Sequence, residues 1–224
     1  MKKDDFSGMK ILVMGLGLNG GGVESARYFA SKGARVTVTD LRDEALLAAS
    51  IEELKDLPIR YVLGRHEMED FQNADLVVKN PGVRPDSPFL KAAHRIETDI
   101  SLFFDACLNR NEQPRITAIT GTKGKSSTSS ALHWVLQEYH SESKCSRPGK
   151  AFLGGNIKIS PLSFVDKLKN GDDVVLELSS WQLGDIRGKN KLKPRAAVLT
   201  PIMRDHLDRY GSMEVYINDK RLIY

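Results

Sequence analysis

The residues best suited to chemistry lie in the sequence GTKGKS, which begins at Gly121. Gly121 and Gly124 leave the backbone N–H groups of this loop uncovered, so they can point at an anion. Lys125 would reach the outer phosphates of a nucleoside triphosphate, and the Ser126 hydroxyl would bind Mg²⁺. Ile119 stands where the longer form of this motif has its first glycine, so the loop is the shortened form. A lysine-bearing surface turn is the alternative interpretation.

A second candidate is Glu177, a carboxylate inside the apolar run VVLEL. Burying a charged carboxylate costs free energy unless the group has a partner. Beside a phosphate loop we expect that partner to be Mg²⁺, because carboxylate oxygens are preferred ligands of this ion. A structural salt bridge is the alternative.

A second glycine-rich stretch, GLGLNG, has Gly15, Gly17 and Gly20 at the spacing of a dinucleotide-binding turn. Asp40 follows at the distance typical of this fold, where an acid accepts a hydrogen bond from a ribose or base. The pattern does not specify the nucleotide, since NAD, FAD and a nucleotide sugar would all fit. Glycines that serve only helix–strand packing are the alternative.

The elements that position these residues can be predicted from the hydrophobic pattern. Helices are predicted after each glycine-rich loop. Further helices are predicted at 43–57, 87–94, 96–108 and 213–224, and strands at 10–14, 35–39, 59–63, 76–79, 115–120, 174–178 and 195–200. This alternation is typical of parallel-sheet α/β proteins. We expect a Rossmann-like domain over residues 1–112 and a P-loop-type α/β domain over residues 113–224, divided at the polar stretch NRNEQP.

Composition limits the partners. The net charge of +4 is spread along the chain, which suits small anionic ligands, and no basic block with interleaved aromatic residues indicates nucleic-acid binding. Cys107 and Cys145 form no CxxC motif, which favours a reducing compartment. The N-terminal sequence does not read as a signal peptide, and no run approaches the ~20 apolar residues of a membrane span. We therefore expect a cytoplasmic protein without membrane insertion.

The motifs GLGLNG, NPGV, TDISLFF, GTKGKSS, LGGNI, LELSSWQL and DHLDRYGSME, together with Lys220, cover nearly the whole chain, and the sequence resembles the Mur ligase family. It is most similar to members that use ATP to add D-glutamate to UDP-N-acetylmuramoyl-L-alanine through an acyl phosphate, in peptidoglycan synthesis. The family has three domains, which bind the UDP of the substrate, ATP, and the incoming amino acid. The resemblance implies that this chain holds the first and an incomplete second domain, as a fragment of a protein that is a monomer when intact.

The resemblance also implies roles for individual residues. The ATP-binding set would be Gly121, Thr122, Lys123, Gly124, Lys125, Ser126 and Ser127. The UDP-substrate set would be Gly17, Leu18, Asn19, Gly20, Asp40, Leu41, Arg42, Asn80 and Asn156. Two Mg²⁺ ions would be held by Ser126, Glu177, His206 and Lys220, and the catalytic set would be Lys125, His206 and Lys220. Because an ammonium group does not bind a cation, Lys220 would be carbamylated by CO₂.

Some positions depart from the family pattern. Lys123 stands where asparagine is common, Lys158 where glycine is usual, and Pro201 where asparagine is frequent. Asp219 adjoins Lys220 where a small residue is common, so it could compete for metal or hinder carbamylation. These departures concern the geometry of the ligand sites rather than the fold.

Three other functions are compatible with parts of the sequence. A nucleotide-binding module without catalysis would need only the two glycine-rich loops. A nicotinamide-dependent oxidoreductase would explain GLGLNG and Asp40, but not GTKGKSS, Glu177 or DHLDRY. Another ligase of the same family would add a different amino acid.

Overall fold

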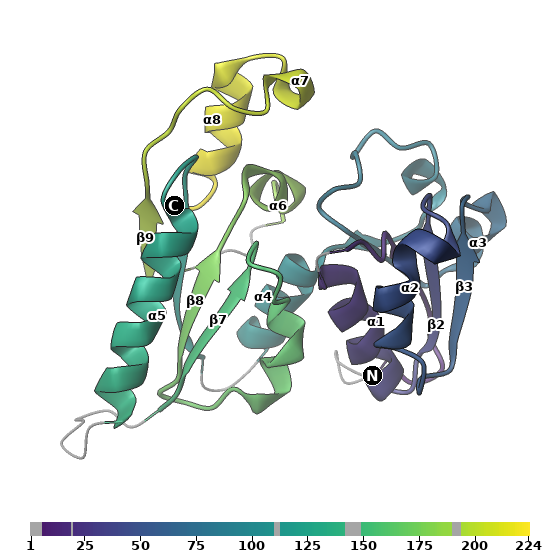
Figure 1. Ribbon diagram of the computed structural model, residues 1–224, viewed down its shortest axis with the longest axis horizontal. Coiled ribbons are helices and arrows are strands. Elements are labelled where there is room, and N and C mark those ends of the chain that lie inside the picture. The colour runs from purple at the N-terminus through teal and green to yellow at the C-terminus, as the bar shows by residue number, and fades with distance from the viewer. Residues whose placement is uncertain (1–5, 19, 110–112, 142–148, 190–193) are drawn as a thin grey trace. The chain divides into compact units, whose positions relative to one another are not determined.

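The computed structural model describes residues 6–18, 20–109, 113–141, 149–189 and 194–224. The chain divides into two compact units, Met1–Leu102 and Phe103–Tyr224 (Figure 1). Helix α4 (Asp99–Leu108) crosses from one unit into the other. The domain boundary that the sequence suggests at residues 112–113 remains a prediction.

Unit 1 is built on a five-stranded parallel sheet with the order β3-β2-β1-β4-β5. The strands are β1 (Lys10–Met14), β2 (Arg35–Asp40), β3 (Ile59–Leu63), β4 (Leu76–Lys79) and β5 (Ile96–Glu97). The helices are α1 (Gly21–Ser31), α2 (Glu44–Glu52) and α3 (Met68–Asn73), with a 3₁₀ turn, η1, at Leu90–Ala92. The strand order reverses direction at β1, and in open α/β sheets ligands bind at the carboxyl ends of the strands beside such a reversal.

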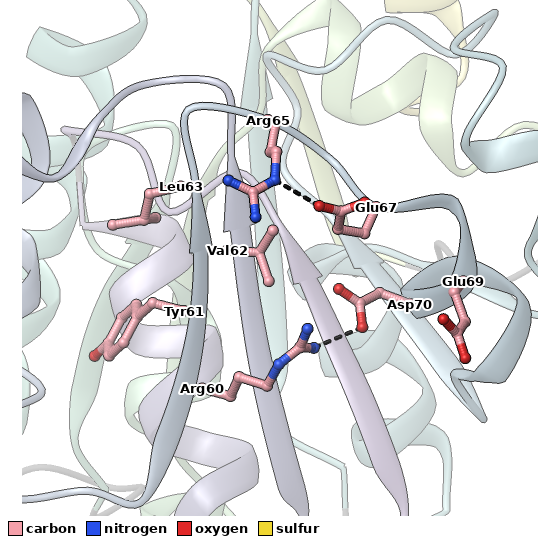
Figure 2. A pocket seen from close by; sticks show the side chains of 8 residues that line it. All are labelled: Arg60, Tyr61, Val62, Leu63, Arg65, Glu67, Glu69 and Asp70. Atoms are coloured by element: carbon pink, nitrogen blue, oxygen red, sulfur yellow. Dashed lines mark hydrogen bonds and ion pairs between the residues drawn. The ribbon is translucent and has the colours of Figure 1, made fainter.

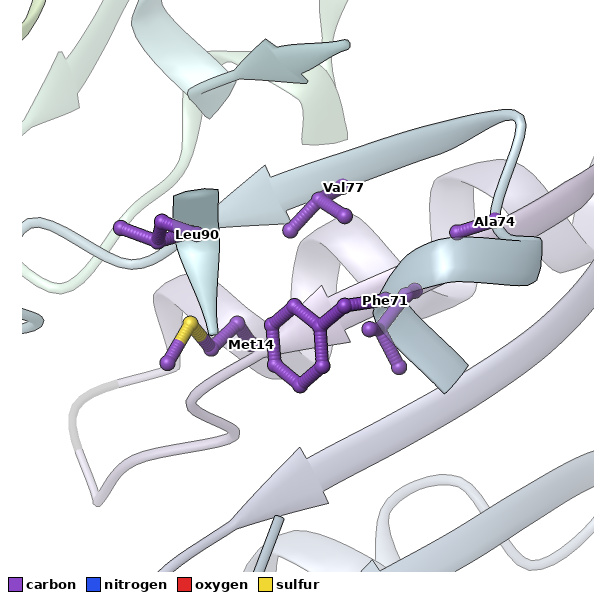
Figure 3. Close-up of a cluster of buried hydrophobic side chains, with 6 residues drawn as sticks. Met14, Phe71, Ala74, Val77 and Leu90 are labelled. Atoms are coloured by element: carbon purple, nitrogen blue, oxygen red, sulfur yellow. The ribbon is translucent and has the colours of Figure 1, made fainter. Parts of the chain in front are cut away.

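One part of the unit 1 core lies between the sheet and the two segments that carry α3 and η1 (Figure 3). Phe71 of α3 is fully buried against Met14 of β1 and Val77 of β4, and Leu90 of η1 covers the same cluster. The apolar side chains of β1 and β4 are buried on both faces, as expected for inner strands of a parallel sheet. This packing fixes the ends of β1 and β4, from which the glycine-rich turn and Asn80 continue.

Unit 2 has a four-stranded parallel sheet with the order β7-β8-β6-β9. The strands are β6 (Arg115–Thr120), β7 (Ala151–Gly155), β8 (Asp173–Glu177) and β9 (Ala196–Leu199). The helices are α5 (Lys125–Ser141), α6 (Ser180–Asp185), α7 (Leu207–Tyr210) and α8 (Met213–Arg221), with 3₁₀ turns η2 (Pro161–Ser163) and η3 (Val165–Lys167). In Figure 1, α5 runs along one face of this sheet, and α6, α7 and α8 lie beyond the carboxyl ends of its strands.

Most predicted strands are confirmed to within a residue, but several predicted elements are wrong. Ile96 and Glu97 were expected in a helix and instead form β5, because they extend the sheet beside β4. The predicted helix at 87–94 is only the turn η1, and the predicted helices at 43–57 and 213–224 end at Glu52 and Arg221. Helix α3 and strand β7 were not expected. The glycine pair in β7 suggested a turn, whereas pairing with β8 makes it a strand.

Candidate functional site

The glycine loop of unit 2 joins the end of β6 to the start of α5. Gly121 has φ 148° and Gly124 has φ 84°, and a Cβ at Gly121 would collide with Thr200. The loop N–H groups therefore lie at the N-terminus of a 17-residue helix, where an anion is favoured. Lys125 is the first residue of that helix, and its Nζ donates to the Thr122 carbonyl at 3.1 Å. A strand, a glycine loop and a helix that begins with a lysine are the elements that a phosphate site requires.

A cavity of about 200 Å³ opens beside this loop. It is lined by residues from the loop, from the ends of β7 and β8, and from the segment that carries α7 and α8: Gly121, Lys125, Asn156, Ser179, Ser180, Trp181, Asp205, His206, Tyr216 and Lys220. The predicted site residues Lys125, Asn156, His206 and Lys220 thus share one cavity, although they are widely separated in the sequence.

Glu177 ends strand β8, next to β6, and its side chain is almost completely buried. Its Oε1 accepts a hydrogen bond from Asn156 Nδ2 at 3.2 Å, whereas its Oε2 is buried with no partner among the described residues. A buried carboxylate oxygen without a partner costs free energy. A cation bound there would remove that cost, so the residues present fit a magnesium ion, and the described part of the chain offers no salt bridge that does the same.

Lys220 lies on α8 with 2% of its surface exposed. Its Nζ donates to the Gly121 carbonyl at 2.7 Å and lies 4.7 Å from the centre of the Tyr216 ring. Burial, and secondly the charge of Lys125, lower the pKa of the Lys220 ammonium to about 8, although Asp205 and Asp219 act in the opposite direction. A lysine with a lowered pKa has a larger neutral fraction near pH 7, and the neutral amine is its nucleophilic form.

His206 precedes α7 in the left-handed region, with φ 53°. Its ring packs against the Trp181 ring, with the centroids 5.1 Å apart, and Arg209 lies 4.0 Å above the same tryptophan. Left-handed backbone is costly for a residue with a Cβ and persists where the surroundings hold it. These aromatic contacts hold the His206 ring at the cavity.

The described residues contain no group of three or more His, Cys, Asp or Glu side chains that could hold a metal ion. Glu177 and Ser126 do not line the cavity, and Glu177 adjoins it through Asn156, so a metal at Glu177 would need other oxygen donors. The Ser126 hydroxyl, phosphate oxygens and a modified Lys220 are donors of that kind.

Asp40 accepts hydrogen bonds from backbone N–H groups at the glycine-rich turn of unit 1 and just after β2. Its Oδ2 accepts from the Gly17 N–H at 3.1 Å and its Oδ1 accepts from the Arg42 N–H at 3.0 Å. Asn80 lies over the turn, with its Oδ1 accepting from the Gly82 N–H. The role of Asp40 as a ligand contact stays a prediction, and its carboxylate has further acceptor capacity for it.

The other residues predicted for the UDP site differ in exposure. Leu18 and Leu41 are exposed, as expected for side chains that could cover a flat ring, and Gly20 immediately precedes α1 with φ 80°. Asn19 lies outside the described residues. Asn156, which was assigned to the same set, belongs to unit 2 and lies beside Glu177.

The residues predicted to bind ATP differ in exposure and in their hydrogen bonds. Lys123, Ser126 and Ser127 are exposed at the start of α5, where they could meet a ligand. Thr122 is buried and its hydroxyl turns inward, to Tyr216 OH at 2.9 Å and to Met203. Its N–H is engaged as well, because it donates to the Pro201 carbonyl at 2.9 Å, so both donors of Thr122 have partners within the chain.

Sequence reasoning did not single out Tyr216, Trp181 or Asp205, which also line the cavity. One signal was present, because Tyr216 and Lys220 are spaced i, i+4 and therefore share a face of α8. Trp181 lies within the motif LELSSWQL, but nothing in the sequence indicated that its ring would meet His206.

A larger cavity, of about 380 Å³, lies in unit 1 between β3 and α3 (Figure 2). Arg60 pairs with Asp70 and Arg65 with Glu67, and Glu69 adds a further carboxylate. Both arginines are thus already paired, so this cavity does not offer a strong anion site. It contains none of the residues predicted to bind a nucleotide.

Both units of the chain match models of known protein families. The model of the Mur ligase MurD-like N-terminal domain matches residues 9–101. The model of the Mur ligase middle domain matches residues 119–224. The chain belongs to the Mur ligase family. This confirms the resemblance seen in the motifs and the α/β fold class.

Among curated proteins, this Mur ligase chain is similar to the UDP-N-acetylmuramoylalanine–D-glutamate ligase of Borreliella burgdorferi strain ZS7, with 47% identity over 100% of the chain and 47% of the relative. The corresponding ligase of Treponema pallidum is 44% identical over 97% of the chain and 41% of the relative. The chain therefore spans less than half the length of these relatives.

Among solved structures, the chain is similar to the UDP-N-acetylmuramate–alanine ligase of Thermotoga maritima, with a TM-score of 0.55 and 25% identity over 96% of the chain and 46% of that protein. A murein peptide ligase of Psychrobacter arcticus has the same fold, with a TM-score of 0.56 at 17% identity, over 96% of the chain and 46% of that protein.

Across the described parts of the Mur ligase chain, no helix is both long and apolar enough to cross a membrane.

Proposed function

We propose that this chain provides the two nucleotide sites of an ATP-dependent ligase that adds D-glutamate to UDP-N-acetylmuramoyl-L-alanine, in cytoplasmic peptidoglycan synthesis. The main support is the cavity in which the phosphate loop meets Asn156, His206 and Lys220, beside the unpartnered oxygen of Glu177. The choice of D-glutamate rests on the names of the relatives that cover the whole chain. The intact protein is proposed to act as a monomer.

The phosphate loop and Lys125 would bind the triphosphate. Backbone N–H groups at the start of α5 and the Lys125 ammonium stabilise the negative charge that spreads over the phosphoryl group in the transition state. A carboxylate oxygen of the substrate attacks the γ-phosphorus, the bond to the ADP oxygen breaks, and an acyl phosphate forms. The uncharged amino group of D-glutamate then attacks the carbonyl carbon, phosphate leaves with the bonding electrons, and the nitrogen loses a proton to give the amide.

Ser126 and Glu177 are proposed to hold one Mg²⁺ ion, and His206 with Lys220 to hold a second. When bound, Mg²⁺ neutralises phosphate charge and orients the transferred group. Lys220 would take part as a carbamate, whose oxygens bind a cation as an ammonium group does not. The buried position of Lys220 supports this, because its lowered pKa makes the neutral amine available for addition to CO₂.

Unit 1 would bind the UDP part of the substrate. The turn at Gly17 and Gly20 leads into the N-terminus of α1, whose first backbone N–H groups would meet a diphosphate, while the Gly17 N–H is held by Asp40. Asp40 and Arg42 supply an acceptor and a donor for the uridine, and Leu18 and Leu41 supply exposed apolar surface for it.

Isothermal titration calorimetry of the 224-residue chain tests this proposal. UDP-N-acetylmuramoyl-L-alanine and Mg·ATP should each bind one saturable site, and NADH should not compete with the former. Lys125→Met should weaken Mg·ATP binding at least about tenfold through loss of charge-assisted hydrogen bonds, and leave the affinity for the UDP-sugar unchanged.

Lys123→Met is the matched control for that substitution. Lys123 is exposed in the same loop and carries the same charge, so it separates a specific role of Lys125 from the general electrostatic attraction of the loop. A smaller loss in Lys123→Met supports the proposal. If the wild-type chain binds neither nucleotide, or if both substitutions have equal effects, the proposed ATP site is wrong.

A further inference from the structure

Tyr216 links the phosphate loop to the helix that carries Lys220. It lies on α8, 1% exposed, and its hydroxyl lies 2.9 Å from the Thr122 hydroxyl in the middle of the loop. The same ring lies 4.7 Å from Lys220 Nζ, one helical turn further along. One buried side chain therefore contacts both parts of the proposed ATP site.

The Thr122 hydroxyl is the other half of this link. It accepts a hydrogen bond from the Met203 N–H at 2.9 Å and lies 3.2 Å from the Met203 carbonyl. The Thr122 N–H donates to the Pro201 carbonyl at 2.9 Å. The middle of the loop is thus held from one side by the segment after β9 and from the other by Tyr216. These contacts restrict a segment whose flanking glycines, Gly121 and Gly124, would otherwise allow it many conformations.

The surroundings of the Tyr216 ring indicate that it is fixed. The Tyr210 ring packs on it with the centroids 5.3 Å apart, and the His206 ring lies at 6.3 Å. Ser212 caps the start of α8 through the Val215 N–H. Because α8 is anchored at this end, the tyrosine hydroxyl has a fixed position from which to hold the loop.

We propose that Tyr216 is a positioning residue that holds the phosphate loop in its anion-binding conformation through the Thr122 hydroxyl, and thereby aligns the loop with Lys220. This inference rests on the proposed ATP site. Without the hydroxyl pair, the glycine-rich loop samples more conformations in the free chain, and nucleotide binding must order it. Loss of the link therefore lowers affinity for Mg·ATP through the conformation of the loop.

The test is calorimetric titration of Mg·ATP into the full 224-residue chain and its variants, with thermal unfolding of each variant measured in parallel. Tyr216→Phe keeps the ring and removes the hydroxyl, and Thr122→Val removes the partner hydroxyl at nearly constant volume. Each should weaken Mg·ATP binding by about five- to tenfold. The double variant should bind about as weakly as Thr122→Val alone, because Thr122→Val already removes the Tyr216 contact together with the two contacts to Met203.

Two further variants separate positioning from general destabilisation. Thr122→Ser retains a hydroxyl and should bind Mg·ATP more tightly than Thr122→Val, which a purely packing role would not produce. Tyr61→Phe removes a buried tyrosine hydroxyl from unit 1 and should leave Mg·ATP affinity unchanged. If Tyr216→Phe unfolds, the serine–valine comparison tests whether the Thr122 hydroxyl, which bonds Met203 as well as Tyr216, holds the loop, and equal affinities overturn the proposal.

The outcomes distinguish this inference from the proposed function. Absence of Mg·ATP binding by the wild-type chain contradicts the proposed function itself. Wild-type binding together with unchanged affinity in Tyr216→Phe, or equal affinities in Thr122→Ser and Thr122→Val, overturns the positioning role alone.

Discussion

At the scale of single residues, the departures from the family pattern have physical consequences that the structure makes visible. Lys158 has φ 66°, a left-handed conformation that costs a residue with a Cβ about 1–2 kcal/mol. Glycine, the usual residue there, avoids this cost. Asp219 was expected to compete for metal or to hinder Lys220. Its carboxylate pairs with Arg187 at 2.6 Å and packs against Gly184, so it joins α8 to α6. Its charge also acts to raise the pKa of Lys220, which disfavours the neutral amine, and the expected competition for metal stays a prediction.

Lys220 supports a prediction on the pH dependence of stability. Its pKa falls from an ordinary 10.5 to about 8 in the folded chain, so the unfolded chain binds more protons between these values. Stability must therefore rise with pH in that window, by at most about 1.4 kcal/mol per pH unit. Chemical denaturation from pH 7 to 10 should show this rise in the wild-type chain relative to Lys220→Met. A constant difference between the two proteins would contradict the lowered pKa.

At the scale of elements, the packing of α1 on the glycine-rich turn gives a further prediction. A Cβ at Gly22 would overlap the backbone of Gly15 and Leu16, whereas a Cβ at Gly21 meets nothing closer than 4.0 Å. Gly22→Ala should therefore destabilise unit 1 by about 1–3 kcal/mol, and the adjacent Gly21→Ala should have little effect. Thermal unfolding of the two variants measures this. Equal stabilities would mean that α1 does not approach the turn so closely.

The same helix shows what the sequence could and could not reveal. The spacing of Gly15, Gly17 and Gly20 predicted the turn, and the long apolar runs predicted β1 and β6 at their observed bounds. The role of Gly22 was not predicted, because close packing depends on where the helix settles against the strand. Short elements such as β5 were also missed, since two residues carry no periodicity and are defined only by their partner strand.

The candidate site was predictable where local chemistry defines it. The phosphate loop, Glu177 and Lys220 could be chosen from residue types and motifs, and the structure brings Lys125, Asn156, His206 and Lys220 to one cavity. The inward turn of Thr122 was not predictable. Its hydrogen bonds join residues that are 81 and 94 positions apart in the sequence, so no local pattern indicates them.

At the scale of the whole molecule, the chain carries two separate parallel sheets, each with a glycine-rich turn at the carboxyl end of an inner strand. The second sheet ends at β9, whose residues are largely exposed, and Trp134 and Val135 of α5 are also exposed. Edge strands and exposed large apolar side chains are each typical of surfaces that another segment covers. The curated relatives are more than twice as long as this chain, so they contain segments that could do so.

The central claim is that the two turns bind different nucleotides, and hydrogen–deuterium exchange on the 224-residue chain tests it most directly. UDP-N-acetylmuramoyl-L-alanine should slow amide exchange around Gly17 and Asp40 and leave the loop at Gly121 unchanged. Mg·ATP should slow exchange in peptides that contain Gly121 and Lys125 and leave unit 1 unchanged. Protection of the same turn by both ligands, or of neither turn by either ligand, would contradict the account.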